Sequence, residues 1–455
     1  MFSLSFDLGK IVEKVRRLEC SRQFQEARNI FFGALRSRPD NIGLWIEWLQ
    51  FLQRTTEPIE LLAEAKKATA RFPNSHAISE IALSAYLANS MYEDAYVIVN
   101  KLYAENVGYP INFDRMARIH RFALGAFCEC IEKEEKYKVE KIRRVAGELK
   151  KHFLFLKHLV ASRGARLIYV IGNCQSWPLI RILNSNKSLT DRYVSVFYKT
   201  IHTLSEVEMY AVSEILDIFD VVVTQRVVNV DRYGPLVTAD LQKRLGEKII
   251  TYPTCWFNAY FPDALSSSGI DCPQFKYEHH SSSVIQSFVS GASIREASDK
   301  LMQLQISPKL IESRLVANFV ETYERDKSLD IKIGNFLERN YQDSQLFYTF
   351  NHCSVSVIGF VANATCNYLG EPELDLSSID RFEGLNRVIW PVPIYVKNAL
   401  GLKFANENFV IDKTPVDISG FVSDSYSYYG RLSEDAVANF TKQANQSLTL
   451  AHSDE

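Results

Sequence analysis

The spacing of apolar residues changes near residue 166, and this change constrains the fold more than any other feature of the sequence. From residue 8 to about residue 160, apolar residues recur every three or four positions, which indicates amphipathic helices. From Arg166 onward, short runs rich in β-branched and aromatic residues alternate with segments of helical period. The sequence therefore predicts an all-α part followed by an α/β part.

The first part contains a 34-residue repeat. Pro39 and Pro73 lie 34 positions apart, and each follows a helical segment that a proline would end. The same step separates Ala27, Leu61 and Ala95. A small residue where two helices cross permits close packing, and this period is that of tetratricopeptide repeats. We predict a tetratricopeptide-like helical array over residues 1–135 and a connecting helix over residues 136–165.

Two roles are open for this predicted array. In the first, it is a structural cap on the second part of the chain. In the second, its concave surface binds a protein partner or a second copy of the chain. The pattern of apolar residues favours neither role over the other.

The second part, residues 166–455, has the pattern of βαβ units. The runs RLIYVIG, YVSVFY, DIFDVVVTQ, EKIITYP and FYTFNH are expected to form strands, with helices between most of them. This alternation predicts a parallel sheet with helices on both faces, in which ligands bind beyond the carboxyl ends of the strands. Residues from about 275 to 340 are mainly helical in pattern and predict an insertion that forms a lid or a wall.

The segment VIGNCQSWP follows the first predicted strand and is the best candidate for a catalytic turn. Gly172 permits a tight turn close to a ligand, and Ser176 can cap a helix that starts with Trp177 and Pro178. Cys174 then lies at a helix N-terminus, where the helix dipole favours a thiolate and free amides can hold an oxyanion. This arrangement is that of a nucleophile elbow with cysteine in place of serine. The alternative is a tight turn with a buried cysteine.

The segment DVVVTQR places Thr224 and Gln225 at the end of another buried strand. The Gln225 amide can donate a hydrogen bond to a developing oxyanion or bind substrate hydroxyl groups. The alternative is a glutamine that only caps the end of the strand.

The segment LFYTFNHCS carries Asn351 and His352 at the end of an aromatic run. His352 is a candidate general base, with Asn351 orienting it or contacting the ligand. The alternative is a structural histidine. His279 and His280 in KYEHHSS form a second candidate base or ligand-binding pair. No carboxylates or cysteines accompany these histidines at a metal-binding spacing, so we expect no metal site.

Composition excludes several classes of function. The formal net charge of −2 over 455 residues gives no overall attraction to nucleic acid or to an anionic membrane. No apolar run approaches the roughly 18 residues that a membrane-spanning helix needs. The eight cysteines are scattered without a C-x-x-C pair, so we expect free thiols in a reducing compartment rather than a zinc site. These features predict a cytoplasmic protein.

In their order and spacing, these segments resemble the WcbI-type polysaccharide biosynthesis proteins. The resemblance rests on YVIGNCQSWPLIRIL, VVVTQRV, YFPD, KYEHH, the helical insertion, LFYTFNHCS and WPVPIYVKNALGLKF, and it covers roughly residues 166–440. It implies an α/β fold similar to that of SGNH-type esterases and bound coenzyme A. It also implies acetyl transfer to a sugar hydroxyl group in capsular polysaccharide synthesis.

The resemblance assigns roles to individual residues. The G-N-C-Q turn of the family falls on Gly172, Asn173, Cys174 and Gln175, its T-Q on Thr224 and Gln225, and its N-H on Asn351 and His352. Two positions depart from the family pattern. Cys353 stands where the family usually has proline, and His279 lies in YEHHS where a Tyr-His-Asp-like element is expected.

Residue patterns and resemblance together predict an acetyl-CoA-dependent O-acetyltransferase that acts on a sugar or polysaccharide precursor. The expected catalytic residues are Cys174, His352 and Gln225, and the expected cofactor-binding residues are Gly172, Asn173, Gln175, Thr224, Asn351 and His279. Either His352 deprotonates the acceptor hydroxyl group for direct transfer, or Cys174 first takes the acetyl group. The alternatives are an SGNH-like esterase, which transfers the acyl group to water, and a non-catalytic tetratricopeptide adaptor.

Overall fold

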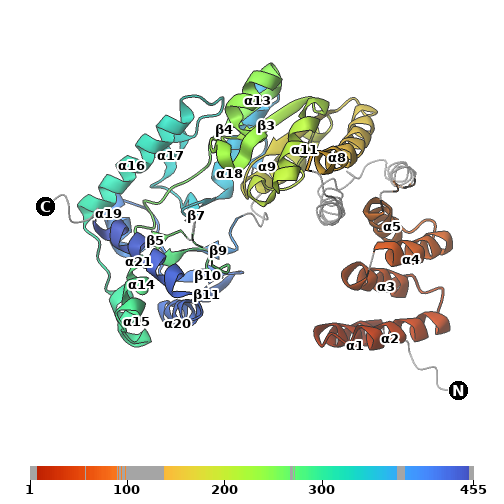
Figure 1. Ribbon diagram of the computed structural model, residues 1–455, viewed down its shortest axis with the longest axis horizontal. Coiled ribbons are helices and arrows are strands. Elements are labelled where there is room, and N and C mark those ends of the chain that lie inside the picture. The colour runs from red at the N-terminus through yellow and green to blue at the C-terminus, as the bar shows by residue number, and fades with distance from the viewer. Residues whose placement is uncertain are drawn as a thin grey trace. The chain divides into compact units, whose positions relative to one another are not determined.

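A computed structural model describes residues 8–449 except residues 57, 90, 92–93, 95–97, 99–137, 267–269, 271 and 377–384. The chain forms two compact units (Figure 1). The helical unit comprises Met1–Ser162 and Tyr210–Ile218, and the α/β unit comprises Arg163–Met209 and Phe219–Glu455. Each unit contains its own cluster of buried apolar side chains.

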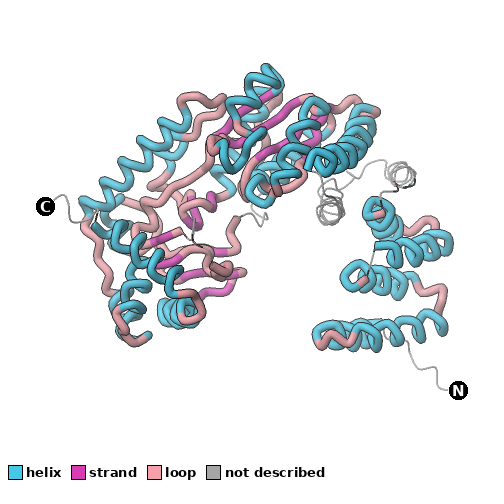
Figure 2. The backbone as a smooth tube through the Cα atoms, viewed as in Figure 1, coloured by secondary structure: helices cyan, strands magenta, loops and turns pink. Residues whose placement is uncertain are grey.

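Five consecutive helices open the helical unit. They are α1 (Leu8–Cys20), α2 (Phe24–Ser37), α3 (Ile42–Thr55), α4 (Pro58–Arg71) and α5 (His76–Ala88). Successive helices pack against one another (Figure 2), and the small residues Ala27 and Ala65 are fully buried between them. The repeated prolines Pro39 and Pro73 follow the ends of α2 and α4 by two residues. The third position of the repeat, Ala95, lies outside the described residues, as do Cys128 and Cys130.

A 24-residue helix, α8 (Lys138–Ala161), completes the described part of this unit. Its buried residues Val145, Leu149 and Phe153 follow a four-residue spacing, which places them on one face. The 3-10 turn η2 (Leu216–Ile218) packs against α8, and the Lys157 ammonium group donates a hydrogen bond to the Ile218 carbonyl group. This contact explains why residues 210–218 belong to the helical unit although the sheet flanks them in sequence.

The α/β unit contains a four-stranded parallel sheet. Its strands are β1 (Arg166–Ile171), β2 (Tyr193–Val196), β3 (Val221–Gln225) and β4 (Ile249–Tyr252), in the order β2-β1-β3-β4. Almost every strand residue is buried, which explains why the strands are continuous apolar runs in the sequence. Helices α9 (Ser176–Ser185) and α18 (Val355–Tyr368) pack side by side against the sheet. The predicted α/β fold with a parallel sheet is confirmed.

The order of the strands creates a topological switch point between β1 and β3. The strand β1 pairs with β2 on one side and with β3 on the other, so the chain changes direction across the sheet between β1 and β3. In parallel sheets such a switch point leaves a crevice at the carboxyl ends of the two strands. The register pairs Ile171 with Thr224, so the residues that follow β1 and the end of β3 meet there.

The run FYTFNH was expected to be a strand of this sheet, and that expectation is wrong. Strands β7 (Phe347–Thr349) and β8 (His352–Cys353) pair with each other as a short antiparallel hairpin. The chain reverses at Phe350 and Asn351, because the intervening residues form a turn instead of continuing the strand.

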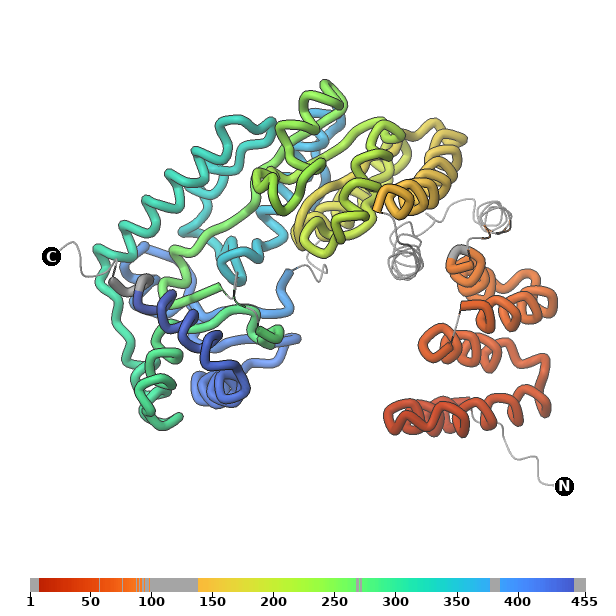
Figure 3. Tube along the Cα trace, in the orientation of Figure 1, coloured from red at the N-terminus to blue at the C-terminus, as the bar shows by residue number. Residues whose placement is uncertain are grey.

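The predicted helical insertion is present as four helices, α14 (Ser282–Val289), α15 (Ile294–Met302), α16 (Pro308–Asp326) and α17 (Gly334–Asn340). They pack against the C-terminal helices α19 (Ile394–Leu400), α20 (Ile418–Tyr429) and α21 (Glu434–Thr449). The contacts pair α14 with α21, α15 with α20, and α16 with α19 (Figure 3). Since insertion and C-terminal segment share one core with the sheet, the insertion is a packed wall rather than a hinged lid.

The remaining elements are short. Short helices and 3-10 turns connect the strands of the main sheet in sequence. They are α10 (Lys187–Thr190), η1 (Ile201–Thr203), α11 (Glu206–Ile215), α12 (Val230–Tyr233), η3 (Gly234–Leu236), α13 (Thr238–Leu245) and η4 (Gly246–Lys248). Two further antiparallel sheets are formed by β5 (Ala264–Leu265) with β6 (His280–Ser281), and by β9 (Val388–Ile389), β10 (Phe409–Ile411) and β11 (Thr414–Val416). Among the described residues, no helix combines the length and apolar character that crossing a membrane requires.

Candidate active site

The turn after β1 lies tightly against its neighbours. The backbone amide of Ile201 donates a hydrogen bond to the Gly172 carbonyl group at 2.8 Å. A Cβ atom on Gly172 would lie 2.7 Å from the Tyr252 hydroxyl oxygen, so only glycine fits at this position. Helix α9 begins at Ser176, and the Ser176 hydroxyl group donates to the Asn173 carbonyl group at 2.7 Å. The expectation that Ser176 caps the helix is therefore wrong, because its hydroxyl group closes the turn.

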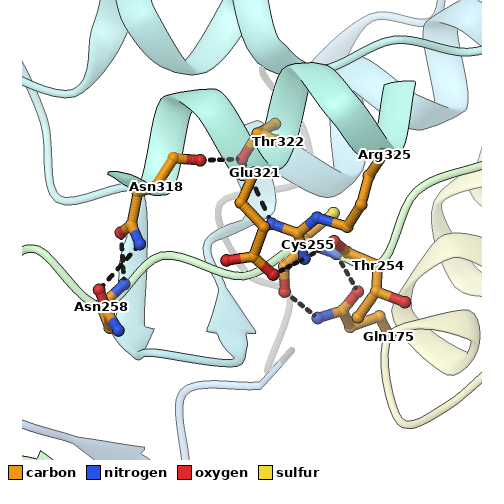
Figure 4. A network of polar contacts seen from close by, with 8 residues as sticks. All are labelled: Gln175, Thr254, Cys255, Asn258, Asn318, Glu321, Thr322 and Arg325. Atoms are coloured by element: carbon orange, nitrogen blue, oxygen red, sulfur yellow. Dashed lines mark hydrogen bonds and ion pairs between the residues drawn. The ribbon is translucent and has the colours of Figure 1, made fainter. Parts of the chain in front are cut away.

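Gln175 joins this turn to the other loops at the same edge of the sheet (Figure 4). Its side chain is fully buried, and its oxygen accepts from the Cys255 amide at 3.1 Å and from the Gln225 side chain at 2.8 Å. Its nitrogen donates to the carbonyl groups of Cys255 and Asn351, each at 2.7 Å. All four hydrogen-bonding positions of the amide are thus used within the protein. The side chain positions the loops, and the backbone amide of Gln175 also donates within the turn, to the side-chain oxygen of Asn173 at 2.9 Å.

Gln225 and Thr224 are also buried where β3 ends. The Gln225 side-chain oxygen accepts from the Asn173 amide at 2.9 Å, and its nitrogen donates to Gln175. The Thr224 hydroxyl group donates to the Gln225 carbonyl group at 3.0 Å and is fully buried. The structure therefore places Gln225 against the turn that carries Cys174, where it holds the Asn173 amide, whereas the Thr224 hydroxyl group bonds within its own strand.

Cys174, His352 and Glu278 form a row of polar side chains beside the switch point of the sheet. The Cys174 sulfur lies 3.5 Å from Nε2 of His352, and Nδ1 of His352 lies 2.9 Å from a carboxylate oxygen of Glu278. The other carboxylate oxygen of Glu278 pairs with Arg387 at 2.8 Å. A nucleophile, a base and a carboxylate that orients the base have the geometry of a catalytic triad.

The surroundings of His352 favour its protonated form. Burial alone lowers the pKa of His352, but the contacts with Cys174 and Glu278 and the charge of Glu278 raise it to about 9. Burial raises the pKa of Glu278, but His352 and Arg387 outweigh this effect and lower it. The imidazole is consequently held in charged form next to a carboxylate at neutral pH, as in activated cysteine enzymes.

Glu278 is the member of this row that the sequence analysis did not identify. It lies in KYEHH, where the adjacent histidines drew attention, and it follows no predicted strand. Its backbone has a φ of +67°, in the left-handed region that residues other than glycine rarely adopt. Strained backbone of this kind is concentrated at functional sites. One feature of the sequence could have drawn attention to Glu278: it is an acidic residue among the polar residues of KYEHHSS.

His279 and His280 support the site instead of providing a second base. The Nε2 atom of His279 lies 2.8 Å from the side-chain oxygen of Asn351, and the His280 ring stacks on Phe275 with centroids 4.7 Å apart. Burial lowers the pKa of His279 to about 4 and that of His280 to about 3. Both rings are therefore neutral and packed, and His279 holds the hairpin that carries His352.

The residues of the site differ in how far they are exposed to solvent. Asn173, Cys174, Asn351 and His352 are each partly exposed, whereas Gly172, Gln175, Thr224 and Gln225 are buried. The residues that the sequence placed at strand ends are thus brought together, but they divide into an accessible row and a buried support. Among the described residues, no group of three or more histidine, cysteine or acidic side chains could hold a metal ion.

Helix α16 fixes the loop that follows β4 (Figure 4). The side-chain oxygen of Asn318 accepts from the backbone amides of Asn258 and Ala259, at 2.8 and 3.1 Å. The Arg325 guanidinium group donates to the Thr254 carbonyl group at 3.2 Å. Since the same loop carries Cys255, these contacts determine where the partner of Gln175 lies. No pattern in the sequence predicted this role for α16.

The fold and the site together define an α/β protein with a cysteine–histidine–glutamate triad at a switch point of its sheet. Residues 167–374 match the family described as polysaccharide biosynthesis enzyme WcbI, so the predicted resemblance is confirmed for this part of the chain. That family is one of enzymes.

A solved structure of WcbI, described as a novel polysaccharide biosynthesis enzyme, superimposes with a TM-score of 0.51 at 18% sequence identity. The match covers 63% of this chain and 98% of that chain. The description of that structure refers to a native protein without a disulfide bond between coenzyme A and one of its cysteines. At this identity the similarity shows a shared fold. No curated protein sequence matches the chain.

Proposed function

We propose that the α/β unit is an acetyl-CoA-dependent O-acetyltransferase that acts on a sugar hydroxyl group of a polysaccharide precursor. The observation that supports this proposal most directly is the row formed by Cys174, His352 and Glu278 beside the switch point of the sheet. The WcbI structure, whose description names both coenzyme A and a cysteine, adds support because the fold is the same. We further propose that the fold is related to SGNH-type esterases and that the enzyme works on capsular polysaccharide.

In the covalent route, the Cys174 thiolate attacks the carbonyl carbon of the acetyl thioester. His352 stabilises the thiolate and then protonates the sulfur of coenzyme A as that sulfur leaves. An acceptor hydroxyl group next attacks the acetyl-cysteine, His352 accepts its proton, and the Cys174 thiolate is released. The backbone amide of Cys174 is the candidate donor to the oxyanion in both steps, because the amides of Asn173, Gln175 and Ser176 already donate within the protein.

In the direct route, His352 takes the proton of the acceptor hydroxyl group, and the resulting oxygen nucleophile attacks the acetyl thioester. This route requires neutral His352 at the start of the reaction, which the raised pKa of about 9 disfavours at neutral pH. We therefore favour the covalent route.

The test combines coenzyme A binding with trapping of the intermediate. Calorimetry on the full chain should detect binding of coenzyme A, and mass spectrometry after brief exposure to acetyl-CoA should detect an added acetyl group on Cys174. Cys174→Ala should abolish both the adduct and the transfer. Full transfer activity in Cys174→Ala would exclude the covalent route, and failure of the native protein to bind coenzyme A would overturn the transferase proposal.

Esterase activity is the second candidate, because the same triad can transfer an acyl group to water. Rapid hydrolysis of simple acetyl esters without coenzyme A binding would favour it over the transferase. Transfer to a sugar that outpaces hydrolysis of acetyl-CoA would exclude it as the main activity.

For the helical unit, we propose a tetratricopeptide-like array that binds a protein partner or a second copy of the chain. On the described helices α1 to α5, the exposed large apolar side chains include Phe24, Phe32, Ile42 and Ile59. The described cysteines are free thiols, which supports a reducing, cytoplasmic location. Light scattering of the native chain and of Ile59→Ser tests self-association, because loss of an oligomer in the variant would identify this surface as an interface.

A further inference from the structure

A cavity of about 510 Å³ lies within the α/β unit, apart from the triad residues. Its walls come from the loop Phe261–Ala264, the C-terminal end of α15, residues 390–395, and the beginning of α20. Cys174, His352 and Glu278 are absent from its lining. The cavity is of a size that takes a small ligand, and the chemistry described so far does not use it.

The charged residues of the lining are all acidic. They are Asp263, Glu407 and Asp417, and no lysine, arginine or histidine contributes to the walls. Asp263 is buried and held by the hydroxyl groups of Ser281 and Ser283. Burial raises the pKa of Asp263, and Arg314 lies beside it outside the lining, so the negative charge of the cavity comes mainly from the exposed Glu407 and Asp417. These two carboxylates disfavour a phosphate group, so the cavity is a poor site for coenzyme A or for the diphosphate of a nucleotide sugar.

Apolar and polar groups share the remaining lining. Trp390 and Phe409 contribute aromatic surface, and Met302 and Ile394 are 56% and 49% exposed, respectively. Polar side chains from Gln305, Glu407, Asn408 and Ser419 also line the cavity, and no hydrogen bond within the described chain engages them. A pyranose ring has the matching chemistry, since its C–H faces pack on aromatic rings and its hydroxyl groups bond to amides and carboxylates.

Trp390 connects the cavity to the triad. Its indole N–H donates to the Tyr277 carbonyl group at 3.1 Å, one residue before Glu278. Its ring centroid lies 6.4 Å from that of His279, which in turn holds Asn351. The wall of the cavity and the orienting carboxylate of the triad are therefore parts of one packed segment.

We propose that this cavity binds an uncharged sugar unit of the acceptor. The inference rests on the proposed function, because it takes the acceptor to be a saccharide. Since the triad residues do not line the cavity, the sugar unit bound here is not the unit that receives the acetyl group. The acceptor therefore contains at least two sugar units, and a free monosaccharide is a poor substrate.

The test measures binding of neutral gluco- and manno-oligosaccharides of two to six units, the matching monosaccharides, and an oligosaccharide containing uronic acid. Ser419→Trp fills the cavity from its exposed edge, and Asn408→Ala removes a polar group without adding bulk. Ser313→Trp, on an exposed position of α16 outside the lining, is the matched control. Calorimetry with coenzyme A on each protein checks the donor site separately.

We expect at least one neutral oligosaccharide to bind the native protein, and its affinity to fall about tenfold in Ser419→Trp and less in Asn408→Ala. Ser313→Trp should bind as the native protein does, and coenzyme A affinity should not change in any variant. Three results would overturn the inference: no binding of any neutral oligosaccharide, equal binding of the uronic oligosaccharide, or loss of coenzyme A binding in Ser419→Trp. A native protein that binds oligosaccharide but not coenzyme A would instead refute the proposed function and leave the sugar site standing.

Discussion

At Gly172 a single added methyl group is enough to disturb the site. Gly172→Ala is expected to lower the free energy of unfolding by about 1–3 kcal/mol, because the new Cβ would meet the Tyr252 hydroxyl oxygen at 2.7 Å. That hydroxyl group is buried and has no hydrogen-bond partner in the described structure, so Tyr252→Phe should remove the clash at little cost.

Chemical denaturation of the two single variants and the double variant measures this coupling. The double variant should recover a large part of the stability that Gly172→Ala loses. If the two effects are simply additive, the Tyr252 hydroxyl group is not what requires glycine at this position.

At Glu278 the carboxylate controls the charge of its neighbour. Glu278→Gln removes the negative charge that faces Nδ1 of His352, so the pKa of His352 should fall below its native value of about 9. We expect transfer activity to fall about 100-fold, as when the orienting carboxylate of a triad is lost. Glu278→Asp is the control, because it keeps the charge and tolerates the left-handed backbone better than most residues. NMR titration of the His352 ring and steady-state kinetics provide the two readouts.

The same pair makes stability depend on pH. The pKa of His352 is raised from 6.5 to about 9 in the folded protein, so its pairing stabilises the fold fully below about pH 6.5. This stabilisation is lost as the pH rises through about 9. Glu278→Gln should show a weaker loss of stability over that interval, and an unchanged pH dependence would argue against the pairing.

The accessible residues of the site were predictable and its orienting residue was not. Cys174 and His352 follow local patterns, namely a strand that ends in a glycine turn and an aromatic run that ends in a histidine. Glu278 belongs to the site only because distant segments pack together, and no local pattern records such packing. The burial of the Gln175 and Thr224 side chains was not predictable for a related reason, since a motif identifies a residue as belonging to a turn without revealing which way its side chain points.

Among the elements, α16 positions the loop that carries Cys255, and this role can be tested by a substitution outside the triad. Arg325 is mostly buried, and its guanidinium group donates to the Thr254 carbonyl group and to the Thr322 hydroxyl group. Arg325→Met keeps the length of the side chain but removes these donors, so the loop with Cys255 should shift and disturb Gln175. We expect kcat to fall about tenfold or more, with KM for acetyl-CoA nearly unchanged.

Steady-state kinetics of Arg325→Met should be compared with those of Arg339→Met, an exposed arginine on α17. Arg325→Lys should restore part of kcat, because it returns a donor to the same region. A matching loss of kcat in Arg339→Met, or a change confined to KM, would show that Arg325 does not position the loop.

The sequence predicted whether a segment is a helix or a strand better than it predicted which other segment it packs against or pairs with. The four strands of the sheet were recognisable because each is a buried run, and the helices of the insertion because their apolar residues have helical spacing. The segment that forms β7 and β8 was expected to be a fifth strand of the sheet. Its aromatic, strand-forming residues are equally compatible with a strand of the parallel sheet and with a separate antiparallel hairpin. Whether a strand joins a sheet depends on the chain reversal at Phe350 and Asn351, which carries no glycine or proline signal.

At the scale of the whole molecule, two separate cores predict two separate unfolding events. Trp48 is fully buried in the helical unit, where its ring stacks on Phe51 and lies against Phe31. Trp48→Ala is expected to destabilise that unit by about 3–5 kcal/mol. Differential scanning calorimetry of Trp48→Ala should show a lower transition temperature for the helical unit and an unchanged one for the α/β unit.

A matched change in the other core completes the experiment. Phe257→Ala removes a fully buried ring of the α/β unit and should shift the second transition alone. A single cooperative transition that moves with either variant would mean that the units unfold together.

Gln175 also determines when the site can first exist. Its bonds reach residues 50, 80 and 176 positions away along the chain. A ribosome that adds about 5–20 residues per second needs roughly 10–35 s to pass from Gln175 to Asn351. During this time the side-chain amide of Gln175 lacks its bond to the Asn351 carbonyl group, because that residue has not yet been synthesised. A nascent chain released before residue 351 would contain the cysteine turn but no assembled active site.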